Sequence, residues 1–223
     1  MRKTFHEKLD EVTEDLLQMG SIIQDTFSNA MEALINNDME LAQKVIDGDS
    51  KIDDYDIMIE EKCMVIQAEY QPVAVDLRLI HSIYIIDIYL ERIGDICVSI
   101  AKLARRLYLK EKINMEKAIL DLLIEMSNVV KTILDKALRA FRNRDAKLAS
   151  KLEQMDDTID SLQKAIYKKL YSSHSRDKNY IKIVTNVSLL SRYLERVGDN
   201  SVNIGDRVVY FLTGDFRAIH SEL

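Results

Sequence analysis

The chain has 223 residues, of which 47% are hydrophobic and 30% are charged. This composition supplies enough apolar surface for a folded core and argues against disorder. The chain holds six glycines, one proline and no tryptophan, whereas a sheet protein of this length needs many turns rich in glycine and proline. The composition therefore predicts long helices and excludes a β-sandwich or a β-barrel.

The charge and the cysteines narrow the class of protein further. A net charge of −6 disfavours nucleic-acid binding, because an acidic surface repels phosphate backbones. Cys63 and Cys97 have no C-x-x-C spacing and are typical of reduced, buried thiols. The N-terminal residues lack the apolar stretch of a signal peptide, and no apolar run reaches the ~18 residues of a membrane span. We expect a soluble cytoplasmic protein.

Apolar residues recur every three or four positions along most of the chain, which is the spacing of amphipathic helices. Breaks in this pattern predict six helices. Asp38 and Asp145 are each placed to cap a helix with their side chain, and Pro72 ends the helix before it. The predicted helices cover about 5–36, 38–70, 73–108, 114–143, 145–171 and 177–213.

The second half of the chain repeats the first. A shift of 107 residues aligns Ile52-Asp53 with Ile159-Asp160, and a shift of 104 aligns Leu90–Asp95 with Leu194–Asp199. The difference between the two shifts falls in the turn between the second and third helix of each half. This pattern indicates a duplication. We expect an all-α fold of two similar antiparallel three-helix bundles, formed by residues 1–110 and 111–223.

Each half carries two pairs of carboxylates, one pair on its second helix and one on its third. The members of a pair are four residues apart, so they lie on one helix face about one turn from each other. We call the four residues of each half its acidic quartet. The first quartet is Asp49, Asp53, Glu91 and Asp95, and the second is Asp156, Asp160, Glu195 and Asp199.

The position of each turn predicts that these pairs meet. In an antiparallel helix pair, residues equidistant from the turn lie side by side. Asp53 with Glu91, and Asp49 with Asp95, share residue 72 as their midpoint, and this residue is the proline. Both midpoints of the second quartet fall between residues 177 and 178. Two independent turns therefore bring four carboxylates to one height in each half.

Four neighbouring carboxylates repel one another, and a bound multivalent cation would reverse the sign of that energy. Oxygen ligands suit hard ions such as Mg²⁺, Ca²⁺, Mn²⁺ or ferric iron. No histidine or cysteine joins the quartets at ligand spacing, which argues against a structural zinc site with nitrogen or sulfur ligands. Asn203, four residues after Asp199, offers one more oxygen. The alternative to a metal site is an acidic patch for a basic partner.

Two further features lie beside the quartets. Gly94 and Gly198 each precede the last carboxylate of a pair, although glycine inside a helix costs ~1 kcal/mol relative to alanine. These positions are expected to need the absence of a side chain, for the approach of a neighbouring helix or of a ligand. Asp87, one turn before Glu91, extends the acidic face of the first half, whereas its counterpart Ser191 does not.

The segment Gln71–Arg78, with the sequence QPVAVDLR, and the two L-E-R-[IV]-G-D segments together resemble the PhoU family of phosphate-uptake regulators. The resemblance covers roughly residues 10–213. It implies two three-helix bundles side by side. It also implies multinuclear clusters of iron or zinc, held on the surface by the two quartets.

The resemblance further implies a homodimer or a higher oligomer. Such a protein restrains phosphate uptake and the phosphate-starvation response, and it contacts the ATPase subunit of the phosphate ABC transporter and a sensor histidine kinase. This chain departs from the family after each motif aspartate, where His-Ala is common, because it has Ile96-Cys97 and Asn200-Ser201. The family's later asparagine is kept as Asn203 but replaced by Ser99 in the first half.

These features favour a protein that is not an enzyme, and two alternatives stay open. One is a di-iron carboxylate oxidase, which needs Glu three residues before a ligand histidine. None of the four histidines meets this requirement, because the residues at that position are Lys3, Arg78, Tyr171 and Arg217. The other is a helical adaptor without metal.

Overall fold

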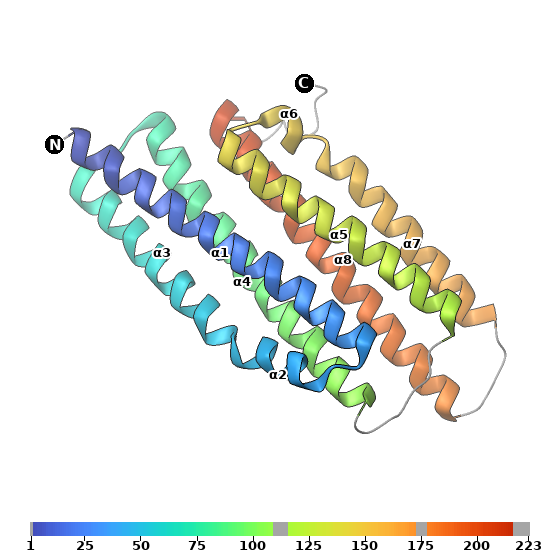
Figure 1. Cartoon of the computed structure of the whole chain (residues 1–223). Coiled ribbons are helices and arrows are strands. Elements are labelled where there is room, and N and C mark those ends of the chain that lie inside the picture. Colours follow the sequence, from blue (N-terminus) through green and yellow to red (C-terminus); the bar gives the residue numbers. More distant parts are fainter. Residues whose placement is uncertain (1, 109–115, 173–177, 216–223) are drawn as a thin grey trace.

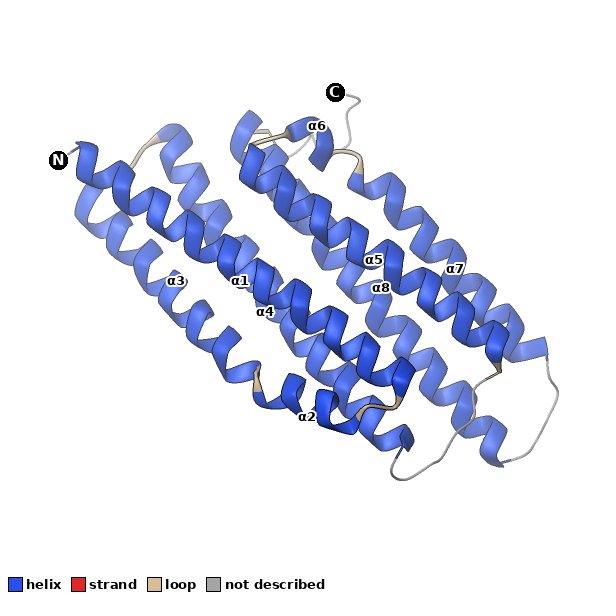
Figure 2. Ribbon diagram, in the orientation of Figure 1, coloured by secondary structure: helices blue, strands red, loops and turns tan. Residues whose placement is uncertain are grey.

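The computed structural model describes residues 2–108, 116–172 and 178–215. Every regular element in these ranges is a helix, as Figure 2 shows. The predicted all-α class is therefore confirmed. The predicted boundary between residues 110 and 111 lies outside the described ranges.

The helices follow the predicted order in each repeat. The first repeat contains α1 (Arg2–Asn36), α2 (Met39–Asp47), α3 (Asp49–Tyr70) and α4 (Ala74–Arg106). The second contains α5 (Lys117–Asn143), α6 (Ala146–Ala149), α7 (Leu152–Ser172) and α8 (Lys178–Thr213).

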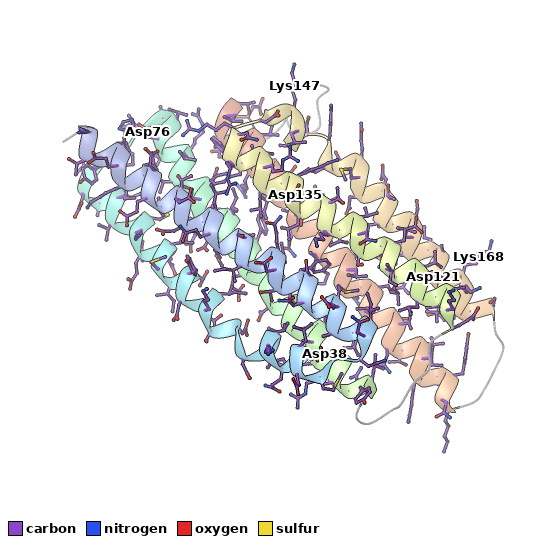
Figure 3. All side chains as sticks on the ribbon, in the orientation of Figure 1. Asp38, Asp76, Asp121, Asp135, Lys147 and Lys168 are labelled. Atoms are coloured by element: carbon purple, nitrogen blue, oxygen red, sulfur yellow. The ribbon has the colours of Figure 1, made fainter. Side chains whose placement is uncertain are left out.

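The second predicted helix of each repeat is divided into a short and a long segment. Gly48 separates α2 from α3, and Ser150 with Lys151 separates α6 from α7. Both short segments begin at the predicted caps. Leu41 N donates to the Asp38 carboxylate at 2.9 Å, and Leu148 N donates to that of Asp145 at 3.0 Å. Asp38 lies at the turn from α1 into α2 (Figure 3).

The two repeats form two bundles that lie side by side (Figure 1). In the first, α3 and α4 run antiparallel and pack against α1, and in the second, α7 and α8 pack against α5 in the same way. The bundles meet chiefly along α4 and α8. One hydrophobic core runs through both, so the two repeats are parts of a single packed body.

Polar contacts also join the bundles. Arg106 on α4 donates a hydrogen bond to the side-chain oxygen of Asn186 on α8. Arg78 Nε, near the start of α4, donates to the backbone oxygen of Phe211 at 3.4 Å. These contacts lie towards opposite ends of α4, so they support the packing of α4 against α8 along its length.

Two further expectations concern the cysteines and the absence of membrane-spanning helices. Cys63 and Cys97 are buried and unpaired, as expected. No helix among the described residues is long and apolar enough to cross a membrane.

Candidate metal centre

The second quartet lies at a close approach of α7 and α8. A Cβ atom at Gly198 would lie 2.6 Å from Ile159 Cδ1 and 2.9 Å from Asp156 Oδ1. Real Cβ atoms do not come so close, so a side chain at this position would displace the ends of Ile159 and Asp156. The expected close approach of a neighbouring helix at Gly198 is therefore present, and that helix is α7.

The charges of the second quartet act on one another. Burial, followed by repulsion from Asp199, Asp160 and Glu195, raises the pKa of Asp156 to about 6. Burial and then Asp199 raise the pKa of Glu195, while Arg192 opposes this shift. Asp156 Oδ1 is buried and has no hydrogen-bond partner. The structure therefore brings the four carboxylates of the second half together, as the turn position predicts.

The first quartet has the same arrangement between α3 and α4. Burial, followed by repulsion from Asp53 and Asp95, raises the pKa of Asp49. The pKa of Glu91 is raised by burial, then by Asp95, and also by Asp53. All four predicted carboxylates of the first half therefore lie close enough to repel one another. Here the glycine faces an apolar side chain, because a Cβ atom at Gly94 would lie 3.0 Å from Ile52 Cδ1.

Both quartets are open to solvent. Each has an outer pair of exposed carboxylates and an inner pair that is half-buried. The exposed residues are Asp53, Asp95, Asp160 and Asp199, and the half-buried residues are Asp49, Glu91, Asp156 and Glu195. Asn203 is half-buried and lies one turn beyond Asp199 on α8. The two sites are therefore surface sites that a cation could reach from solvent.

The donor set fits a hard cation, although the side chains are not arranged around one. Among the described residues, no three or more His, Cys, Asp or Glu side chains converge in a geometry ready to hold a metal ion. The outer aspartates are exposed, so their side chains can rotate towards an ion. Carboxylates that repel one another, with a buried oxygen of Asp156 left unpaired, are groups that a cation would stabilise.

One acidic residue, Asp87, is more deeply buried than its sequence pattern indicated. Asp87 is 1% exposed, although the sequence indicated only an extension of the acidic face. Its neighbours gave a signal, because Ile83, Ile86 and Leu90 at helical spacing are all fully buried. A position within such a stripe faces the core whatever residue occupies it.

Comparison with known proteins agrees with this architecture. The sequence profile of the PhoU domain matches residues 16–104 and 123–208. The chain is 36% identical to the "Phosphate-specific transport system accessory protein PhoU homolog" of Clostridium acetobutylicum, over 96% of each chain. It is also 36% identical to the homolog of Pseudomonas aeruginosa, over 96% of this chain and 88% of that one.

Solved structures show the same fold. The crystal structure of PhoU from Pseudomonas aeruginosa matches with a TM-score of 0.88 and 35% identity, over 95% of this chain and 100% of that one. The phosphate transport system regulatory protein PhoU from Streptococcus pneumoniae matches with a TM-score of 0.85 and 31% identity, over 98% and 100%. This chain therefore belongs to the PhoU family.

Proposed function

We propose that this protein is an accessory protein of phosphate transport that restrains phosphate uptake and the phosphate-starvation response. The observation that carries the proposal is similarity over nearly the whole chain to proteins named for that role. The relatives from Clostridium acetobutylicum and Pseudomonas aeruginosa are named as accessory proteins of the phosphate-specific transport system. The structural relative from Streptococcus pneumoniae is named as a regulatory protein of phosphate transport.

The proposed partners are the ATPase subunit of the phosphate ABC transporter and a phosphate-sensing histidine kinase. The protein acts in the cytoplasm as a homodimer and reaches the membrane only through these partners. Its net charge of −6 supports contact with basic patches, because complementary charge speeds association and selects the partner. The same charge disfavours nucleic acid as a partner.

The protein acts without catalysing a reaction. A carboxylate di-iron oxidase needs histidine ligands placed three residues after glutamate, and the sequence has none. The chemistry of transport and signalling then belongs to the partners, while this chain supplies a helical surface.

We also propose that the two quartets, with Asn203 beside the second, bind metal ions. Iron or zinc clusters are the expected occupants, and Mg²⁺, Mn²⁺ or Ca²⁺ are the alternatives. A bound cation supplies positive charge. The half-buried residues Asp49, Glu91, Asp156 and Glu195 would hold it from the helix side, and the exposed aspartates would close over it. The raised pKa values of Asp156 and Glu195 favour this proposal over a metal-free adaptor, because burial and then repulsion between carboxylates raise them, and a cation would offset both effects.

A deletion strain tests the regulatory function. We expect a reporter for a phosphate-scavenging gene to be active in the deletion strain in phosphate-rich medium, and silent again after complementation. The tagged protein should co-purify with the transporter ATPase and the kinase. A silent reporter in the deletion strain, together with no transporter or kinase subunit in the purification, would overturn the proposal.

Complementation with variants tests whether the quartets matter for that function. Glu195→Gln with Asp199→Asn should fail to silence the reporter fully. The matched control is Asp121→Asn with Asp135→Asn, which removes two carboxylates from α5, outside both quartets. Equal silencing of the reporter by both variants would show that the regulatory role does not depend on the second quartet.

A further inference from the structure

A second group of acidic side chains lies between α3 and α4, beyond the first quartet and towards Pro72. We call Asp56, Glu60 and Asp87 the Asp87 cluster. Asp56 and Glu60 are half-buried on α3, while Asp87 on α4 is 1% exposed. The cluster obeys the register of the quartet, because Asp56 and Asp87 are equidistant from the same turn to within one residue.

The Asp87 carboxylate points into this cluster without a hydrogen-bond donor. Neither of its oxygens has a partner when the neighbouring carboxyl groups are ionised. Asp56 lies close enough for a hydrogen bond to Asp87 when one of the two groups carries a proton. The only hydroxyl donor that reaches the cluster among the described residues is Tyr84 Oη, at 3.5 Å from Glu60 Oε1.

The energetic effect of this arrangement is large. Burial, followed by repulsion from Asp56, Glu60 and Glu91, raises the pKa of Asp87 to about 9. Among the described residues, no lysine or arginine forms an ion pair with any member of the cluster. Asp87 is therefore protonated at neutral pH, and it can ionise there only if a positive charge joins the cluster.

The second repeat shows that the fold does not need acids at these positions. The shifts that align the repeats place Gln163 at the position of Asp56, Tyr167 at Glu60 and Ser191 at Asp87. Gln163 Nε2 donates to the backbone oxygen of Ser191 at 3.4 Å. The Ser191 hydroxyl donates to the backbone oxygen of Ser188 at 3.1 Å. Neutral residues can therefore fill these positions between the two helices. The packing of the helices does not explain why the first repeat has acidic residues there.

We propose that Asp56, Glu60 and Asp87 form an additional site for a hard divalent cation, such as Mn²⁺ or Mg²⁺, in the first repeat only. Three carboxylates offer the oxygen ligands that these ions prefer. Asp87 is the buried ligand, and Asp56 and Glu60 form the side open to solvent. The three oxygen donors do not converge as they stand, so Asp56 and Glu60 rotate inward when the ion binds. The site shares no ligand with the quartets and does not depend on their binding metal.

Exchange between the repeats gives the sharpest test. The variant Asp56→Gln/Glu60→Tyr/Asp87→Ser places three residues of the second repeat at the equivalent positions of the first. The second repeat already accepts these residues in the same helix pairing. The matched control is Asp54→Asn, which neutralises an exposed carboxylate on α3 outside the cluster. Mn²⁺ is titrated into the full chain after chelator treatment, and electron paramagnetic resonance counts the free ion.

The proposal expects the exchanged variant to bind one Mn²⁺ ion fewer per chain than the control. In a background with Asp53, Asp95, Asp160 and Asp199 changed to Asn, the same exchange should remove the remaining high-affinity ion. Unchanged Mn²⁺ binding after the exchange would overturn the proposal, and it would leave the quartets and the regulatory role intact. If the exchanged chain does not fold by circular dichroism, Asp87→Asn replaces it, because the amide keeps the shape of the side chain. Loss of one Mn²⁺ ion in Asp87→Asn would then support the proposal, and unchanged Mn²⁺ binding would overturn it.

Discussion

Asp156 on α7 lies against the backbone of Gly198 on α8, so that a Cβ atom at Gly198 would be 2.9 Å from Asp156 Oδ1. The equivalent glycine of the first repeat, Gly94, faces Ile52 at 3.0 Å and has no carboxylate in contact. Both glycines therefore face the equivalent isoleucine, Ile52 or Ile159, and only Gly198 also faces a carboxylate. In the second repeat the absence of a side chain leaves room for a proposed metal ligand.

This difference gives a matched pair of substitutions. Gly198→Ala should displace the Asp156 carboxylate and weaken Mn²⁺ binding by the second repeat by roughly tenfold or more, since positions that orient metal ligands typically have effects of this size. Gly94→Ala should leave Mn²⁺ affinity close to that of the unaltered chain, because only Ile52 must move. Isothermal titration calorimetry measures both. Equal losses would mean that the glycine does not position Asp156.

The stability of the metal-free chain should fall as pH rises. The pKa of Asp87 is raised from 3.8 to about 9 in the folded chain, so the folded state binds the proton more tightly than the unfolded state does. Stability is then greatest at low pH and decreases through this interval, by at most about 1.4 kcal/mol per pH unit. The pKa of Asp156, raised to about 6, adds a smaller decrease that is complete near that pH, because solvent screens this half-buried group.

Urea unfolding in the presence of a chelator, at several values between pH 5 and pH 9, checks this dependence. Asp87→Ser should remove most of the slope above pH 7, where Asp156 no longer contributes. A slope that persists unchanged in Asp87→Ser would show that another group is responsible.

The two side-chain caps should contribute similarly to stability. Asp38→Ala and Asp145→Ala each remove the acceptor of one helix N-terminus, and each is expected to lower the free energy of unfolding by about 1 kcal/mol. Asp121→Ala, an exposed change within α5, is the control and should have little effect. Urea unfolding at neutral pH measures all three. No loss in either cap variant would mean that solvent satisfies these amides equally well.

The sequence predicted the features that depend on helical periodicity and on short turns. A turn at Pro72 between two antiparallel helices determines which residues lie side by side. The same arithmetic that pairs Asp53 with Glu91 also pairs Glu60 with Tyr84, whose hydroxyl bonds to Glu60 in the structure. The breaks after α2 and α6 were not predicted, because the apolar pattern continues across Gly48 and across Ser150.

The burial of Asp87 was not predicted for a different reason. An amphipathic pattern defines one apolar face, but α4 packs against α1, α2, α3 and α8 and is buried on several sides. Asp87 therefore lies inside, although its residue type is typical of a surface. His81 lies in an apolar stretch of the same helix and is nevertheless exposed. The apolar neighbours of Asp87 gave a signal for its burial, whereas the exposure of His81 follows from the arrangement of the helices around α4.

Each quartet is proposed to be a separate cation site, and the metal content of the purified chain tests this most directly. Protein purified without chelator is analysed by mass spectrometry of its metals, as the unaltered chain and as Glu195→Gln/Asp199→Asn. Metal that binds only the folded state should also raise the melting temperature, and a chelator should lower it. We expect the variant to lose the metal of the second repeat and to keep that of the first. Metal content that is the same in both proteins would contradict the claim, because the ligands would then lie elsewhere.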